Sequence, residues 1–200
     1  MNWQIHLLFA VAALLAIAAH GAGHILVGRL AGIPMQRVRY TATGLRLISG
    51  EGGFPSYSCE AWIALGGPLG NLIGSAVVIF IHRYCHSLPV FCDYFVTLSL
   101  YLGALNLLPI KGFDGGRILV CLLCAHHPPV PSLLPRQADR VLSVTSGLLL
   151  ILFWLVAVYL LLRRGTALSL HVFCMQLFYA VFVEQSEAEQ LSRRAAHFRE

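Results

Sequence analysis

The sequence contains little charge for its length. Only 12% of the 200 residues are charged, whereas 58% are hydrophobic, and soluble domains carry roughly 25% charged residues. No charged side chain occurs between Met1 and Gly28, and several later charge-free stretches are also long enough to cross a bilayer. The shortage of charge therefore excludes an ordinary soluble domain and predicts an integral membrane protein.

The few basic residues are unevenly distributed, and their distribution predicts the orientation in the membrane. We expect about five spanning helices, at residues 3–31, 59–82, 93–110, 141–162 and 166–183. With the N-terminus outside, all of the 14 Lys and Arg residues except Arg83, Arg163 and Arg164 lie on the cytoplasmic side. The net charge of +5 is thus explained by topology, so we expect contact with the lipid bilayer and none with nucleic acid.

The six cysteines do not indicate a disulfide framework. They lie mostly in or beside apolar segments, which is typical of small packing residues. Cys85 and Cys92 flank the short outer loop between the second and third expected spans, where either a disulfide or two thiols is compatible with the sequence. Cys121 and Cys124 lack a second ligand pair, so they support a zinc site only weakly.

The chain divides into four expected parts. Residues 1–125 form a membrane core, 126–140 a Pro-rich linker, 141–184 an appended helical hairpin and 185–200 a polar cytoplasmic tail. Between the first two spans, residues 37–49 alternate polar and apolar side chains around Gly44, which predicts a β-hairpin, with an interfacial loop as the alternative. The predicted fold class is an all-α polytopic membrane protein with a three-helix core and this small hairpin.

One glutamate is missing from an otherwise familiar pattern in the first span. In His20-Gly-Ala-Gly-His24 the two histidines are about one helical turn apart, so both imidazoles project from one face and can share a metal ion. In the H-E-x-x-H pattern of zinc hydrolases, a glutamate follows the first histidine and acts as general base. Gly21 occupies that position here, so the sequence has metal ligands but lacks the base.

Asp114 is the leading candidate for a third ligand. Pro109 and the glycines after it break the third span where the membrane meets the cytoplasm, and this places Asp114 at a bend. The predicted topology puts the histidine pair at a similar depth, and a catalytic zinc usually has three protein ligands. Taken alone, the histidines could equally pack or form hydrogen bonds, and Asp114 could cap the break. Gly21 and Gly23 could also allow another helix to pack closely.

These motifs, taken in order, resemble the site-2 protease family of intramembrane zinc metalloproteases, particularly its compact bacterial members of the sporulation-factor-processing type. The resemblance covers residues 1 to about 125. It rests on the histidine pair, the hairpin-like connection, Gly67-Pro-Leu-Gly-Asn71, and Asn106-Leu-Leu-Pro109 followed by Asp114-Gly-Gly116. The chain departs from the family pattern at Gly21, where the catalytic glutamate is replaced.

The resemblance implies a three-helix metalloprotease core in a bacterial cell membrane, with the metal site near the cytoplasmic side. His20, His24 and Asp114 would bind Zn²⁺. Asn106, Pro109 and Asn71 would shape a substrate cleft beside it. The hairpin edge would receive a transmembrane protein substrate as an unwound strand, because a helical substrate hides its carbonyls in its own hydrogen bonds.

The sequence therefore leaves two main functional hypotheses. The first is a zinc endopeptidase that cuts in or near transmembrane segments through zinc-activated water, with turnover weak or absent because Gly21 lacks a base. Glu51 is the carboxylate nominated as a substitute, although an ordinary solvated loop charge is its usual role. The second is an inactive relative that binds a membrane partner. A metal-ion carrier is disfavoured, since the other histidines line no single predicted path.

Overall fold

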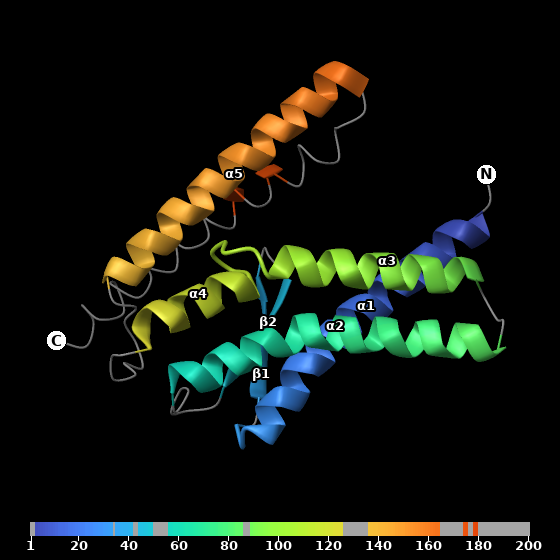
Figure 1. Cartoon of the computed structure of the whole chain (residues 1–200), viewed down its shortest axis with the longest axis horizontal. Helices are drawn as coiled ribbons and strands as arrows, with labels where there is room; N and C mark the ends of the chain where they lie inside the picture. The colour runs from blue at the N-terminus through green and yellow to red at the C-terminus, as the bar shows by residue number, and fades with distance from the viewer. Residues whose placement is uncertain are drawn as a thin grey trace.

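The protein is built from five helices and one pair of strands in the part of the chain that the structure describes. In this computed structural model the described residues are 3–33, 35–41, 44–49, 56–85, 89–125, 136–164, 174–175 and 178–179. The elements, labelled in Figure 1, are α1 (Trp3–Leu30), β1 (Met35–Thr41), β2 (Gly44–Ser49), α2 (Tyr57–Cys85), α3 (Pro89–Asn106), α4 (Asp114–Cys124) and α5 (Arg136–Arg164).

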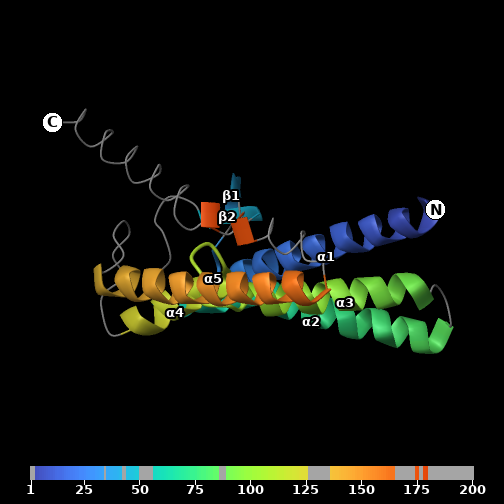
Figure 2. The same ribbon diagram turned by 90° about the horizontal axis from the view of Figure 1, so that it is seen from above.

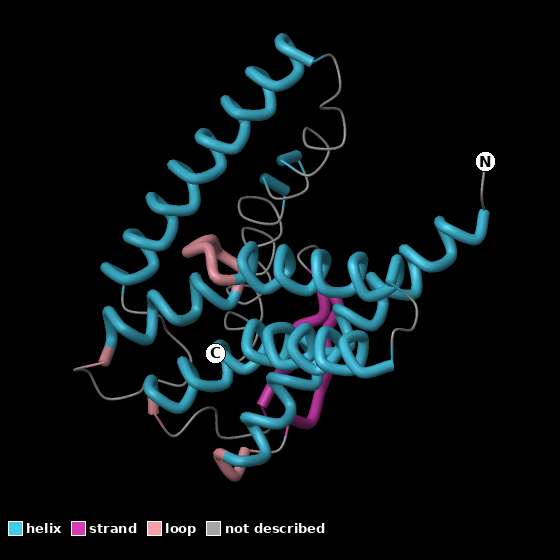
Figure 3. The backbone as a smooth tube through the Cα atoms, turned by 45° about the vertical axis from the view of Figure 1, so that its right-hand side comes forward, coloured by secondary structure: helices cyan, strands magenta, loops and turns pink. Residues whose placement is uncertain are grey.

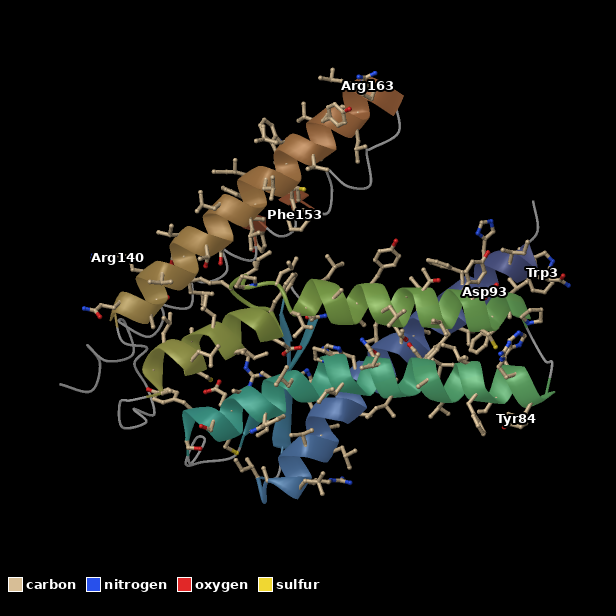
Figure 4. The ribbon with its side chains drawn as sticks, viewed as in Figure 1. Trp3, Tyr84, Asp93, Arg140, Phe153 and Arg163 are labelled. Carbon is tan, nitrogen blue, oxygen red and sulfur yellow. The ribbon has the colours of Figure 1, made fainter. Side chains whose placement is uncertain are left out.

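Helices α1, α2 and α3 pack against one another and form the core of the fold. Helices α2 and α3 run antiparallel, and α1 crosses them in a second layer, as the two perpendicular views show (Figures 1 and 2). Trp3, Tyr84 and Asp93 lie at the same end of this core (Figure 4). Trp3 and Tyr84 are exposed, as expected for aromatic side chains at a membrane interface.

Small residues bring α1 and α2 into close contact. A Cβ atom at Gly23 would collide with the backbone of Gly66, and one at Gly70 would lie 2.5 Å from the carbonyl oxygen of Ala19. Such side chains would force the two helices apart, so the close-packing interpretation of Gly23 is confirmed. At Gly21 a Cβ would meet no other part of the described chain within 4 Å, so the described residues make no such contact there.

Three helices among the described residues are long and apolar enough to cross a membrane: Trp3–Leu30, Tyr57–Tyr84 and Gln137–Arg163. The span expected at 93–110 is instead the 18-residue helix α3, which is not among these three and ends at Asn106. It ends early because Pro109 disfavours helical geometry at the residue before it. Most of the span expected at 166–183 lies outside the described residues, as do the linker residues 126–135.

The connection between α1 and α2 contains the two strands. β1 and β2 pair antiparallel, with Arg37 opposite Ile48 and Thr41 opposite Gly44. The register is irregular between Met35 and Arg37. The two strands form a sheet of their own, and β1 also contacts α1.

Helix α5 begins at Arg136, before the span expected at 141–162, and it packs against α4 and the loop that precedes α4. Leu150 joins Ile110 and Phe113 of that loop in one buried cluster. Figures 1 and 3 show α5 leaning away from the three-helix core toward its C-terminal end, and Figure 4 places Arg140 and Arg163 near its opposite ends. The helix is therefore anchored at the loop that leads to Asp114.

Candidate metal centre

Three potential ligand atoms from two distant parts of the sequence converge at one point. His20 and His24 lie on α1, and Asp114 is the first residue of α4. Oδ2 of Asp114 lies 3.1 Å from Nε2 of His20 and 3.4 Å from Nε2 of His24, while the two Nε2 atoms are 3.3 Å apart. The sequence-based expectation that these three side chains meet is therefore confirmed.

The size of this triangle fits a tetrahedral zinc ion. Zinc binds histidine nitrogen and carboxylate oxygen at about 2.0–2.2 Å, so ligand atoms in a tetrahedral site are separated by about 3.3–3.5 Å. The observed separations of 3.1, 3.3 and 3.4 Å are close to that range. Oδ2 of Asp114 is also buried, and its polar neighbours are the two imidazole Nε2 atoms. A metal ion between these three atoms would pair the buried carboxylate with a positive charge, because buried charges are costly unless they are paired or coordinate a metal.

Gly67 of α2 provides the space beside this triangle. A Cβ atom at this position would collide with Nε2 of both His20 and His24. Any larger residue would therefore push the imidazoles out of place. The first glycine of the Gly-Pro-Leu-Gly-Asn motif is therefore explained by the space that the two imidazoles need.

Each histidine is held by a second contact from α2. Nδ1 of His24 donates a hydrogen bond of 2.7 Å to the carbonyl oxygen of Ile63, which leaves its Nε2 free to bind a metal. Nδ1 of His20 lies 3.2 Å from the side-chain amide nitrogen of Asn71. Asn71 therefore reaches across the contact between α2 and α1. Outer contacts of this kind fix the orientation of metal-binding histidines.

Asp114 is held by its own surroundings. Nη1 of Arg117 lies 3.7 Å from Oδ1 of Asp114, and Nε of Arg117 lies 3.5 Å from Oε1 of Glu60. Burial alone would raise the pKa of Asp114, but the adjoining imidazoles of His20 and His24 outweigh it and lower the pKa to about 2. Asp114 is thus a carboxylate at neutral pH, which is the form that binds metals.

The chain reaches Asp114 through a tight approach between backbone segments. Cβ atoms at Gly115 and Gly116 would collide with the carbonyls of Leu107 and Ile110, respectively. Gly112 has a positive φ of 90°, a conformation that favours glycine. The glycines after Pro109 therefore allow α4 to start directly beside the end of α3, with Asp114 facing the histidines.

The other residues assigned to the site from the sequence make hydrogen bonds away from the histidines or lie outside the described residues. Asn106 donates a hydrogen bond of 2.9 Å to the carbonyl of Leu102 in its own helix, and the carbonyl of Pro109 accepts one of 3.4 Å from Thr145 of α5. The role of Asn106 and Pro109 in a substrate cleft remains a prediction. Glu51 lies outside the described residues, and so does the side chain of Cys85.

The cysteine pair of α4 behaves as packing residues. Burial raises the pKa of the Cys121 thiol to about 12, and it also raises the pKa of Cys124. Both remain neutral thiols at physiological pH, whereas thiolates are the metal-binding form.

A solved structure has the same overall arrangement. The site-2 protease from Methanocaldococcus jannaschii superposes with a TM-score of 0.63 and 18% sequence identity, covering 90% of this chain and 77% of that one. The chain shares its fold. No family model and no curated protein matches the sequence. Together with the three apolar helices, this likeness supports a membrane protein.

Sequence reasoning missed several residues around the centre. The carbonyl of Ile63, the space at Gly67 and the Glu60–Arg117 pair were not recognised as parts of it. A usable signal existed for two of them. Glu60 is the one carboxylate in the sequence of α2, and Arg117 lies three residues, about one helical turn, after Asp114.

Proposed function

We propose that this protein is a membrane-embedded zinc protein of the site-2 protease type. Its reaction would be the hydrolysis of peptide bonds in or near transmembrane segments, and its turnover would be weak or absent because Gly21 replaces the general base. The observation that carries the proposal is the convergence of His20, His24 and Asp114 at the separations that a tetrahedral zinc ion requires. The fold shared with a site-2 protease supports the same assignment.

The residues present can hold the metal and orient it, but they do not complete a hydrolytic centre. A zinc ion there would supply Lewis-acid chemistry toward a peptide carbonyl and a bound water. His20, His24 and Asp114 would hold it, and Arg117 would steady Asp114. Gly21 offers no proton acceptor, and a general base contributes about 10²- to 10⁴-fold to such reactions.

An inactive protein that binds a membrane partner is the second candidate, and the carboxylates near the site favour it. Among the described residues, Glu60 is paired with Arg117 and Asp139 with Lys111, while Asp93 lies at the opposite end of the core (Figure 4). Apart from Asp114 itself, each described carboxylate is therefore either engaged by a basic side chain or located at the other end of the core. In this candidate the centre holds the fold together, and a transmembrane protein is bound without being cut.

The proposal includes a substrate path and an orientation. The β1–β2 pair would receive the bound segment as an extended strand, because an unpaired strand edge offers backbone donors and acceptors. The distribution of basic residues supports an N-terminus outside and a metal centre near the cytoplasmic side, and the resemblance to compact bacterial members of the family supports a bacterial cell membrane.

Metal analysis of the purified chain in detergent tests the proposal. We expect one zinc ion per chain, and loss of it in Asp114→Ala and His24→Ala. His6→Ala is the matched control, since His6 lies exposed on the same helix α1 and should leave the zinc content unchanged. Absence of stoichiometric zinc from the unmodified chain would refute the metal centre. Chelator-sensitive cleavage of a co-reconstituted single-span reporter would decide for the protease over the inactive binder.

A further inference from the structure

Asn71 is a fully buried polar side chain that touches one of the metal ligands. It lies on α2 with 1% of its surface exposed, and its amide nitrogen lies 3.2 Å from Nδ1 of His20. The amide oxygen has no hydrogen-bond partner among the described residues. The amide nitrogen therefore contacts the imidazole, and rotation of the amide group can bring the amide oxygen to the same position.

The direction of this hydrogen bond determines which nitrogen of His20 carries the proton. When the Asn71 amide nitrogen donates to Nδ1, the proton of the neutral imidazole is on Nε2. Nε2 is the atom that faces Asp114 and His24, so this tautomer blocks the metal-binding position. A metal at Nε2 requires the proton on Nδ1, and Nδ1 then needs a hydrogen-bond acceptor.

The two histidines differ in this respect. His24 already donates from Nδ1 to the backbone carbonyl of Ile63, which can only accept, so its Nε2 is free whether or not a metal is bound. His20 depends on a side chain whose two ends are a donor and an acceptor of nearly equal size. Rotation of the Asn71 amide by about 180° replaces the nitrogen by the oxygen at Nδ1.

We propose that Asn71 is a positioning residue that accepts a hydrogen bond from Nδ1 of metal-bound His20 through its amide oxygen. This inference rests on the proposed metal centre. Asn71 thereby selects the tautomer and ring orientation in which Nε2 of His20 points at the metal. The role is additional to the substrate-cleft role expected for this residue from the sequence.

Two substitutions test whether the side chain at position 71 must accept a hydrogen bond. Asn71→Asp keeps only acceptors, whereas Asn71→Leu has a similar volume and no hydrogen-bonding group. Loss of such an outer partner typically lowers metal affinity about 10- to 100-fold. We expect Asn71→Leu to bind zinc about 10- to 100-fold more weakly and Asn71→Asp to bind it at least as tightly as the unmodified chain.

The measurement is zinc affinity of the full chain in detergent, by competition with a chromophoric chelator, together with the absorption spectrum of the cobalt-substituted protein. Ser75→Ala is the matched control, because Ser75 is 2% exposed one turn further along α2 and its hydroxyl makes no hydrogen bond within the described residues. Its affinity and cobalt spectrum should not change. A change confined to Asn71→Leu would separate ligand positioning from a general loss of packing.

The outcomes distinguish this inference from the proposed function. If the unmodified chain binds no zinc, the metal centre itself is wrong. If it binds zinc and Asn71→Leu binds equally well, or Asn71→Asp loses zinc as Asn71→Leu does, only the role of Asn71 is wrong. Should Asn71→Leu fail to fold, Asn71→Asp decides alone, since an acceptor-only side chain cannot replace an essential donor.

Discussion

Replacing Gly21 by glutamate would test whether the missing base limits hydrolysis. A Cβ atom at Gly21 meets no other part of the described chain within 4 Å, so the structure can accept a longer side chain there. The position directly follows His20, as the glutamate does in H-E-x-x-H zinc hydrolases. We therefore expect Gly21→Glu to fold, to retain zinc and to gain peptidase activity.

The expected gain follows from the usual contribution of a general base. That contribution is about 10²- to 10⁴-fold, which corresponds to about 2.7–5.4 kcal/mol of transition-state stabilisation. The assay is kcat/KM for cleavage of a single-span reporter in proteoliposomes, with the zinc content of each preparation measured in parallel. Normalising the rate to bound zinc separates a change in chemistry from a change in metal occupancy.

Gly21→Gln is the control, since glutamine has nearly the shape of glutamate but cannot take up the proton. We expect it to behave like the unmodified chain, so that only the carboxylate raises the rate. Equal rates for all three proteins at full zinc occupancy would refute the reasoning that the base is the missing part. A large gain with glutamine would show instead that volume at this position, and not proton transfer, was limiting.

Three further changes test the geometry of the centre. Gly67→Ala should abolish zinc binding, measured as metal content, because its methyl group would collide with Nε2 of both histidines; retention of stoichiometric zinc would contradict this. Gly23→Ala should destabilise the protein by about 1–3 kcal/mol in denaturant unfolding, since it forces α1 from α2, and an unchanged midpoint would argue against that contact. Zinc at 100 times its dissociation constant should stabilise the unmodified chain by about 2.7 kcal/mol, which is measured as a rise in melting temperature. Asp114→Asn should remove most of that rise.

The convergence of the three candidate ligands was accessible from the sequence because two local rules determine it. Helical spacing puts His20 and His24 on one face, and the break after Pro109 brings Asp114 back to the same end of the core. The outer contacts were not accessible, since they depend on how α2 lies against α1. A backbone carbonyl such as that of Ile63 carries no sequence signal, and only the packed structure shows that a side chain at Gly67 would displace both imidazoles.

The bounds of the helices show a similar division between local and tertiary information. Charge-free length alone extended the third span to residue 110, whereas backbone chemistry at Pro109 ends α3 at Asn106. Helix α5 was expected as an appended unit, but the backbone nitrogen of Lys111 donates to the hydroxyl of Ser146 at 2.9 Å, and Nζ of Lys111 pairs with Asp139 at 2.7 Å. Hydropathy does not report such contacts, because it treats each span separately.

The contrast between Gly21 and Gly23 bears on which candidate function the chain favours. Gly23 is required by its contact with Gly66, so the fold explains it completely. No contact among the described residues requires Gly21, so nothing in that part of the chain accounts for a glycine at the position of the base. Meanwhile the three candidate ligands converge, Ile63 accepts a hydrogen bond from His24, Asn71 contacts His20, and the space at Gly67 is present. A metal in this centre would join α1 to α4 directly, and that structural role needs no general base. The arrangement therefore supports metal binding more strongly than it supports turnover.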